Sequence, residues 1–406
     1  MSTQATTLSP GIALADWAMQ TSPSALQQML AAATGNDVIS FALGLPAQEL
    51  FPVGAYGNAV AQVLANEKHA LQYSPPLRPL KSQIVKLMAM RGVSCREEQI
   101  FVTAGAQQGL SLLSRLLLNP GGQLVTEELT YTGFQQAIEP FQPNVITVPT
   151  NASSGIDLLA LESVLKREER PAFIFTMTEG HNPLGVSLRE EDRRRLAELA
   201  RCYQVPVVED DAYGFLRYDE AGPPPMRAFD EDWIFYVGSF SKILAPSLRV
   251  GWLIVPEPLI PVLSVIKEAS DIDTATFTQR TVVAYLEAGH LPDHIKELRL
   301  AYRERRDCMI EALSEHFPSG ARWNKPDSGV FVWVDLNAVV DTTEILRRAI
   351  ETQRVAYIPG QAFAVNGRAC SQSCLRLNFS HCPPELIKEG IARLGHVLKQ
   401  SVGQSH

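Results

Sequence analysis

Short apolar segments alternate with helix-like segments through the middle of this chain, and this alternation limits the possible fold more than any other feature. The segments that we expect to be strands are 99–103, 123–126, 144–148, 172–176, 206–209, 233–238 and 250–255. Helical patterns such as 107–118 and 191–203 lie between several of them. Strands separated by helices favour a mostly parallel sheet with both faces covered, so the sequence predicts an α/β fold.

The pattern changes after Gly289, where one long, charge-rich helix is expected over 290–317. Shorter strand-like segments follow at 329–336, 355–358 and 375–379, separated by helical patterns, which indicates a smaller α+β unit. We therefore predict three parts. They are an N-terminal segment, 1–50, that packs on the small domain, a large domain, 51–289, and a linking helix with a small C-terminal domain, 290–406.

Polar or flexible residues follow several of the predicted strands. Gly105, Asn182, Asp210 and Lys242 all lie at the carboxyl ends of such segments. Ligands of parallel α/β sheets bind at this edge, so we expect these residues to meet in one site.

The segment 238–252, GSFSKILAPSLRVGW, places Lys242 between serines and ahead of Arg249. A lysine forms a Schiff base only when its amine is unprotonated, which requires a partly desolvated pocket rich in cations. Ser239, Ser241 and Arg249 can hold a phosphate by charge-assisted hydrogen bonds. Taken alone, the segment could also be a solvated basic loop.

Four further motifs occur in order along the chain: FVTAGAQQGL at 101–110, NPLG at 182–185, VVEDDAY at 207–213 and CLRLNFS at 374–380. The first reads as strand, glycine turn and helix start, and a helix N-terminus with a glycine suits an anion. Individually the others are a turn, strand-end caps and an edge strand with a surface arginine.

Together these motifs resemble the fold-type-I pyridoxal-phosphate-dependent aminotransferases of class I/II, in particular the branch that includes kynurenine and α-aminoadipate aminotransferases. The resemblance extends from Val38–Pro46 through Leu71–Tyr73 to Ile358–Phe363. It implies a large domain with a mostly parallel sheet, a smaller α+β C-terminal domain and pyridoxal 5′-phosphate as the cofactor.

The resemblance also implies the site residues. Lys242 is expected to be the catalytic lysine, with Asp210 on the pyridinium nitrogen and Tyr213 on the phenolic oxygen of the cofactor. The full set of expected cofactor contacts is Gly105, Ala106, Gln107, Tyr131, Asn182, Asp210, Tyr213, Ser239, Ser241, Lys242, Arg249 and Tyr73. The expected substrate contacts are Gly44, Asn182, Arg376 and Glu179. Arg376 should bind the α-carboxylate, and Tyr73 should reach the neighbouring subunit of a homodimer. No metal is expected.

Some positions depart from the family pattern. Ala106 replaces a common serine, and the loop after Tyr73 is shorter than usual. Gly180 replaces an aromatic residue, which predicts space beside the substrate, and Glu179 would then bring negative charge that suits a cationic substrate. The alternative is that Glu179 points to solvent. Asp271 and Asp273 raise the same question, with helix capping as the ordinary explanation.

The predicted function is an aminotransferase that acts on an α-amino acid and a 2-oxo acid. The alternative is a pyridoxal-phosphate-dependent lyase or cyclase acting on a long basic amino acid such as hydroxyarginine. A ligand-sensing regulatory module is disfavoured, because no DNA-binding segment precedes the domain. A net charge of −8 gives no electrostatic basis for binding nucleic acid or an anionic membrane. The absence of a signal-like N-terminus, the lack of a membrane-spanning run and the scattered cysteines predict a cytoplasmic enzyme.

Overall fold

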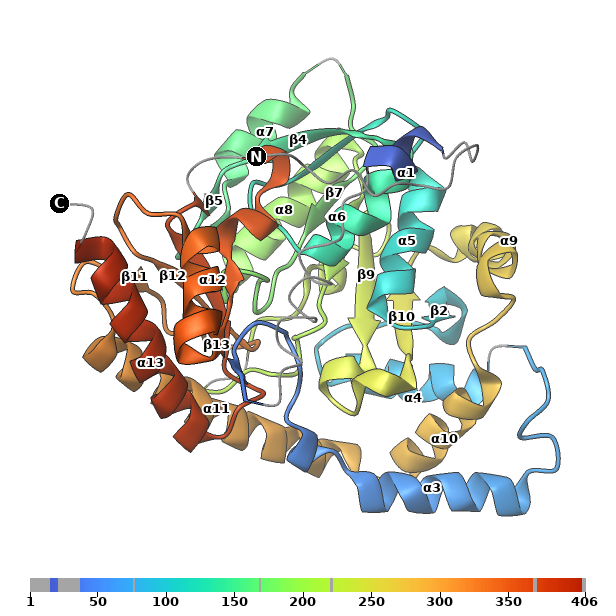
Figure 1. Ribbon diagram of the computed structural model, residues 1–406. Helices are drawn as coiled ribbons and strands as arrows, with labels where there is room; N and C mark the ends of the chain where they lie inside the picture. Colours follow the sequence, from blue (N-terminus) through green and yellow to red (C-terminus); the bar gives the residue numbers. More distant parts are fainter. Residues whose placement is uncertain are drawn as a thin grey trace, which may run out of the picture.

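The computed structural model describes residues 15–20, 37–75, 77–167, 169–219, 222–367 and 371–403, and its central feature is a seven-stranded sheet (Figure 1). In spatial order the strands are β2 (Ile100–Thr103), β10 (Gly251–Ile254), β9 (Ile234–Ser239), β8 (Val207–Asp210), β7 (Ile174–Thr176), β3 (Gln123–Glu127) and β4 (Asn144–Val148). Only β10 runs antiparallel to its neighbours. Each strand predicted for this sheet is present, which confirms the mostly parallel α/β fold.

Neighbouring residues on the strands face opposite sides of the sheet, as the strand period of two requires. Ile174 and Val207 pack into one core cluster, whereas Phe175 and Val208 pack into another. The helices whose residues complete these two clusters are α7 (Leu158–Leu165) and α8 (Glu190–Tyr203) in the first, and α5 (Ala106–Leu117) and α6 (Thr132–Ile138) in the second. The sheet is therefore buried on both faces.

A second, antiparallel sheet is formed by the C-terminal part of the chain. Its strands, in order, are β11 (Arg322–Trp323), β12 (Phe331–Asp335), β15 (Cys374–Asn378) and β14 (Ile358–Pro359). The predicted linking helix is α11 (Leu291–His316), which packs along α13 (Pro384–Gly403) beneath the small sheet, with α12 (Thr342–Gln353) beside it (Figure 1).

The segment 355–358, which we predicted as one strand, is divided between two sheets. β13 (Val355–Ala356) pairs in parallel with β1 (Ile39–Ser40), while β14 pairs with β15. The described part of the N-terminal segment thus contacts the C-terminal part of the chain. The next residue, Phe41, extends this contact: its N–H donates to the Ala356 carbonyl and its carbonyl accepts from the Asn378 N–H, both at 2.8 Å.

The remaining helices and a small hairpin surround the large sheet. They are α1 (Asp16–Gln20), α3 (Val53–Asn66), α4 (Arg78–Ala89), α9 (Ile260–Asp271), α10 (Thr276–Glu287) and the strands β5 (Thr150–Asn151) and β6 (Gly155–Ile156). No helix in the described ranges has the length and apolar character needed to cross a membrane.

Candidate active site

A cavity of about 350 Å³ lies at the carboxyl ends of the parallel strands. It is lined by residues from both sheets and from the segment that follows β1. The predicted residues that the structure brings together in its wall are Gly44, Ala106, Gln107, Tyr131, Asn182, Asp210, Tyr213, Ser239, Ser241, Lys242, Arg249 and Arg376. They come from distant parts of the chain, and this convergence makes the cavity the candidate active site.

Lys242 lies in the short helical turn that follows β9, and its Nζ donates a hydrogen bond of 2.6 Å to the Gly44 carbonyl. Removal from water lowers the pKa of Lys242 to about 8, and the Arg376 and Arg249 guanidinium groups contribute to the shift. An appreciable fraction of this amine is therefore unprotonated near neutral pH, as a nucleophilic or proton-carrying lysine requires.

Asp210 is the last residue of β8 and is 2% exposed. Burial raises the pKa of Asp210 to about 7, although the Ala212 N–H, which donates to Oδ1 at 3.2 Å, opposes the shift. The flanking acids, Glu209 and Asp211, do not line the cavity, and Glu209 accepts a hydrogen bond from the Thr178 hydroxyl. Asp210 is therefore the member of this acidic run that faces the cavity.

The turn between β2 and α5 lies against Arg249. Gly105 has a φ of +87°, and a Cβ at this position would lie 2.4 Å from Arg249 Nη2. Arg249 Nη2 donates to the Ala104 carbonyl at 3.1 Å. Ser239 and Ser241, whose hydroxyls are hydrogen-bonded at 2.9 Å, line the same end of the cavity. Hydroxyls, a guanidinium and a helix N-terminus together form an anion-binding end.

Arg376 on β15 is 4% exposed and lies at the other end of the cavity. Its Nη1 donates to Asn182 Oδ1 at 2.7 Å and its Nη2 donates to the Ala42 carbonyl. The guanidinium carbon lies 4.0 Å from the Phe331 ring centroid. Desolvation lowers the pKa of Arg376 to about 9. The structure gives this buried cation no carboxylate partner among the described residues, so the site can accept one from a ligand.

Two tyrosines complete the predicted set. Burial raises the pKa of Tyr131 to about 12 and raises the pKa of Tyr213 further, so both hydroxyls stay protonated and can donate hydrogen bonds. The Tyr213 ring packs edge-on against Phe331, with centroids 5.7 Å apart.

The expectation that Glu179 faces a substrate, and its alternative that Glu179 points to solvent, are both wrong. Glu179 is fully buried, outside the cavity wall, and accepts hydrogen bonds from Arg193 Nη2 at 2.5 Å and Arg217 Nη1 at 3.0 Å. Burial acts to raise the pKa of Glu179, but these guanidinium groups and that of Arg91 outweigh it and lower the pKa to about 2. Glu179 is therefore ionised at neutral pH and is held by arginines of the fold rather than facing the cavity.

The expected space at Gly180 is absent as well. Gly180 has a φ of +56°, and a Cβ there would lie 2.7 Å from the Cα of Gly329. The backbone of the segment before β12 therefore fills the place of the family's aromatic residue. Asp271 is hydrogen-bonded to Lys267, and Asp273 accepts from the Thr274 N–H; neither lines the cavity.

Tyr73 does not reach the cavity of its own chain. Its side chain is 81% exposed, and it lines a separate shallow hollow with Lys267, Ile272 and Asp273. Because a single copy is described, its predicted role in a neighbouring subunit stays a prediction.

Sequence reasoning missed most of the apolar wall of the cavity. The additional lining residues are Leu43, Leu45, Thr132, Met177, Ala212, Pro246, Phe331, Ile358 and Ala362. Leu43, Leu45, Ile358 and Ala362 lie in segments that carry the family resemblance, which was an available signal. Phe331 had none, because only the packing of the small sheet against the large one brings it to the cavity.

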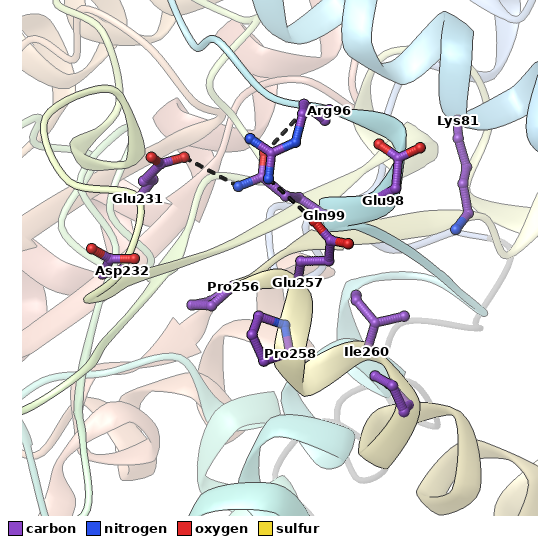
Figure 2. A pocket seen from close by; sticks show the side chains of 11 residues that line it. Lys81, Arg96, Glu98, Gln99, Glu231, Asp232, Pro256, Glu257, Pro258 and Ile260 are labelled. Atoms are coloured by element: carbon purple, nitrogen blue, oxygen red, sulfur yellow. Dashed lines mark hydrogen bonds and ion pairs between the residues drawn. The ribbon is translucent and has the colours of Figure 1, made fainter.

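A second hollow, of about 630 Å³, lies at the opposite edge of the large sheet (Figure 2). Gln99, just before β2, donates from Nε2 to Glu231 at 3.2 Å, and Arg96 pairs with Glu257 at 3.2 Å. Charges of both signs line this hollow, including Lys81, Glu98 and Asp232, whereas the charges in the wall of the first cavity are mainly cationic. The described residues also contain no group of three or more His, Cys, Asp or Glu side chains placed to hold a metal ion.

Comparison with known proteins shows which family the chain resembles. Residues 36–394 match the family model described as aminotransferase class I and II. Aromatic-amino-acid aminotransferase 1 of Thermococcus litoralis is 38% identical over 93% of this chain and 92% of its own length.

Solved structures of aminotransferases have the same fold as this chain. A multiple substrate aminotransferase of Thermococcus profundus superposes with a TM-score of 0.90 at 36% identity, covering 96% of this chain and 98% of the other. An α-aminoadipate aminotransferase of Thermus thermophilus, complexed with N-(5′-phosphopyridoxyl)-L-leucine, superposes with a TM-score of 0.87 at 33% identity, covering 95% and 96%.

Proposed function

We propose residue roles and a substrate class for this chain from the premise that it belongs to the class I and II aminotransferases. It is a fold-type-I, pyridoxal-phosphate-dependent enzyme that moves an amino group between an α-amino acid and a 2-oxo acid. The curated and structural relatives carry aminotransferase names, so the alternative of a lyase or cyclase is not favoured.

The residues of the cavity fit pyridoxal phosphate by charge. In our proposal the phosphate binds to Arg249, Ser239, Ser241 and the N-terminus of α5 at Ala106 and Gln107, because these groups form the anion-binding end. Asp210 faces the cavity as a buried carboxylate with a pKa of about 7, and a cationic ring nitrogen beside it would keep it ionised.

When bound, pyridoxal phosphate supplies an electron-withdrawing ring that stabilises negative charge at the substrate Cα. We assign Lys242 Nζ the transfer of the Cα proton, because its lowered pKa leaves unprotonated amine near neutral pH. The Gly44 carbonyl orients this amine. With the cofactor bound, Tyr131 would lie against its ring and Tyr213 would donate to its phenolic oxygen, since both tyrosines line the cavity.

We assign the substrate α-carboxylate to Arg376. The guanidinium presents a planar fork, and Asn182 Oδ1 holds one of its nitrogens at 2.7 Å. Because Oδ1 accepts from Arg376, the Asn182 amide N–H groups are left to donate to the cofactor and the substrate. Asn182 thereby links the two binding functions.

The proposed amino acid has an uncharged, largely apolar side chain. This conclusion is carried by one observation: the cations in the described cavity wall are Lys242, Arg249 and Arg376, and all three have roles toward the cofactor or the α-carboxylate. The rest of the wall is mainly apolar, and its acid, Asp210, serves the ring. The first 67 residues contain no Lys or Arg, so the segment around Leu43 offers no cation for a distal carboxylate. The same wall gives no partner to a distal ammonium or guanidinium.

The test is a spectral screen of the purified enzyme loaded with pyridoxal phosphate. Leucine and phenylalanine should convert the cofactor to its amine form with a kcat/KM at least about tenfold above that of glutamate or arginine. This factor is the expected cost of placing one unpaired substrate charge against an apolar wall. A preference for glutamate would indicate a cation from a second subunit and overturn the proposed side-chain class. A preference for arginine would overturn it as well.

We further propose a cytoplasmic homodimer with the divisions 1–50, 51–289 and 290–406. The exposure of Tyr73 and of Ile272 beside it supports a second copy at this surface, where Tyr73 would reach the partner's phosphate. Sedimentation of the purified protein tests the dimer, and a monomer with full activity would exclude a shared site.

A further inference from the structure

We propose that Gln108, held by Lys267 and Asp271, is a positioning residue that fixes the phosphate-binding turn 104–107. This inference rests on the proposed binding of phosphate by that turn. Gln108 lies in the first turn of α5, next to the predicted contact Gln107, but does not itself line the cavity. Its effect on the cofactor must therefore pass through the backbone.

The Gln108 carboxamide connects three elements. Its Oε1 accepts from the Ala104 N–H at 2.7 Å and from Lys267 Nζ at 2.9 Å, and its Nε2 donates to Asp271 Oδ2 at 2.5 Å. A flipped amide would place its NH2 group against two donors. The orientation of the side chain is therefore fixed by its partners.

Lys267 and Asp271 form the rigid side of this arrangement. Both lie on α9, four residues apart, and Lys267 is 3% exposed. Lys267 Nζ donates to both Asp271 oxygens, at 2.7 and 3.0 Å, so its three hydrogens are used by Asp271 and Gln108. The buried ammonium is thus hydrogen-bonded to both Asp271 and Gln108, which ties the Gln108 carboxamide to α9.

The turn is thus held on both sides of Ala104. Gln108 accepts from its N–H, and Arg249 donates to its carbonyl. The next carbonyl, that of Gly105, accepts from Thr103 Oγ1 at 3.0 Å. These bonds set the direction of the free N–H groups of Ala106 and Gln107. Because Ala106 has no hydroxyl, phosphate binding depends on the aim of these backbone donors.

The experiment measures the dissociation constant of pyridoxal phosphate by titration of the apoprotein. Gln108→Ala should weaken binding about tenfold, the factor that corresponds to one hydrogen bond of ordinary net strength. The thermal midpoint of the apoprotein should fall as well, because buried Lys267 and the Ala104 N–H each lose an acceptor. Binding is therefore measured at a temperature well below the midpoints of both proteins. Gln108→Glu should also weaken binding, because the new carboxylate would face the carboxylate of Asp271. Adding Asp271→Asn to this variant should restore binding, because the asparagine amide can again donate a hydrogen bond between the two side chains.

Two reference variants separate the possible outcomes. Lys166→Met removes an exposed lysine that pairs with Glu162 at the same spacing of four residues, and it should change nothing. Arg249→Ala removes a proposed phosphate contact. If Arg249→Ala weakens binding but Gln108→Ala does not, the positioning role is wrong while the phosphate site stands. If neither weakens binding, both assignments are wrong. Failure of the double variant to restore binding would also contradict the role of Gln108.

Discussion

Two buried arginines, Arg193 and Arg376, show how a structural charge differs from a functional one. Arg193 is fully buried and donates to Glu179 at 2.5 Å and to the carbonyls of Leu188 and Thr178 at 2.9 Å. Arg376 is almost as buried, yet among the residues that the structure describes it donates only to the Asn182 side-chain amide and the Ala42 carbonyl, and its Nε finds no partner there.

The difference lies in where the negative charge comes from. The region around Arg193 is neutralised within the fold, and the pKa of Glu179 is accordingly low. The described wall of the cavity holds three cations against one acid, Asp210, and desolvation lowers the pKa values of Lys242 and Arg376. A ligand carboxylate would therefore stabilise the charged form of Arg376, because no carboxylate of the described residues is paired with it.

The largest expected effect comes from the lysine of the cavity. Lys242→Ala should lower kcat by at least about a thousandfold, because it removes the group that carries the Cα proton. The thermal midpoint should change little. Stopped-flow and steady-state rates would measure the loss, with Lys296→Ala, an exposed lysine on α11, as the matched control. Substantial remaining activity with the natural donor would contradict the assignment.

The next effect separates two adjacent acids. Asp210→Asn should lower kcat about a hundredfold or more, because a neutral amide cannot stabilise the cationic ring nitrogen. Asp211→Asn should chiefly lower stability, because Asp211 binds Arg91 at 3.2 Å and Tyr236 at 2.9 Å outside the cavity. Rates and urea midpoints of both variants provide the test. If Asp211→Asn is the variant with the large kinetic loss, the assigned positions are exchanged.

Truncating Arg376 and Arg193 to alanine should have different effects, one on catalysis and the other on stability. Arg376→Ala should raise KM for all amino acids and lower kcat/KM about a hundredfold, the usual cost of removing one side of a buried charge pair with a ligand. Arg193→Ala should instead destabilise the fold, because it leaves Glu179 underpaired. Equal stability losses with unchanged KM in both variants would remove the distinction between the two regions.

The smallest kinetic effect is expected at Glu179. Glu179→Gln should lower the free energy of unfolding by about 3 kcal/mol at pH 7, with no selective loss for basic amino acids. The folded pKa is about 2, below the unfolded value, so this stability is complete above about pH 5 and is lost as the pH falls toward 2. Urea unfolding at several pH values should show the stability difference between parent and variant shrinking below about pH 5 and disappearing as the pH approaches 2. A constant difference would contradict the charge-based explanation.

The sequence by itself determined the strands of the large sheet and the chemical groups of the site. Local patterns were sufficient because strand period, glycine turns and strand-end polar residues are properties of neighbouring residues. Lys242, Asp210 and Arg249 each follow or flank such a segment, and the structure places all three in one cavity. The same reasoning identified the linking helix, since its length and charge pattern are local features.

Only the tertiary structure decided which charges are free. Arg376 meets Asn182 across 194 residues of sequence, and Glu179 is neutralised by Arg193 and Arg217. The backbone of Gly329 fills the space beside Gly180. No local pattern distinguishes a paired acid from an unpaired one, because the free energy of a buried charge depends on its distance to partners that the fold brings together.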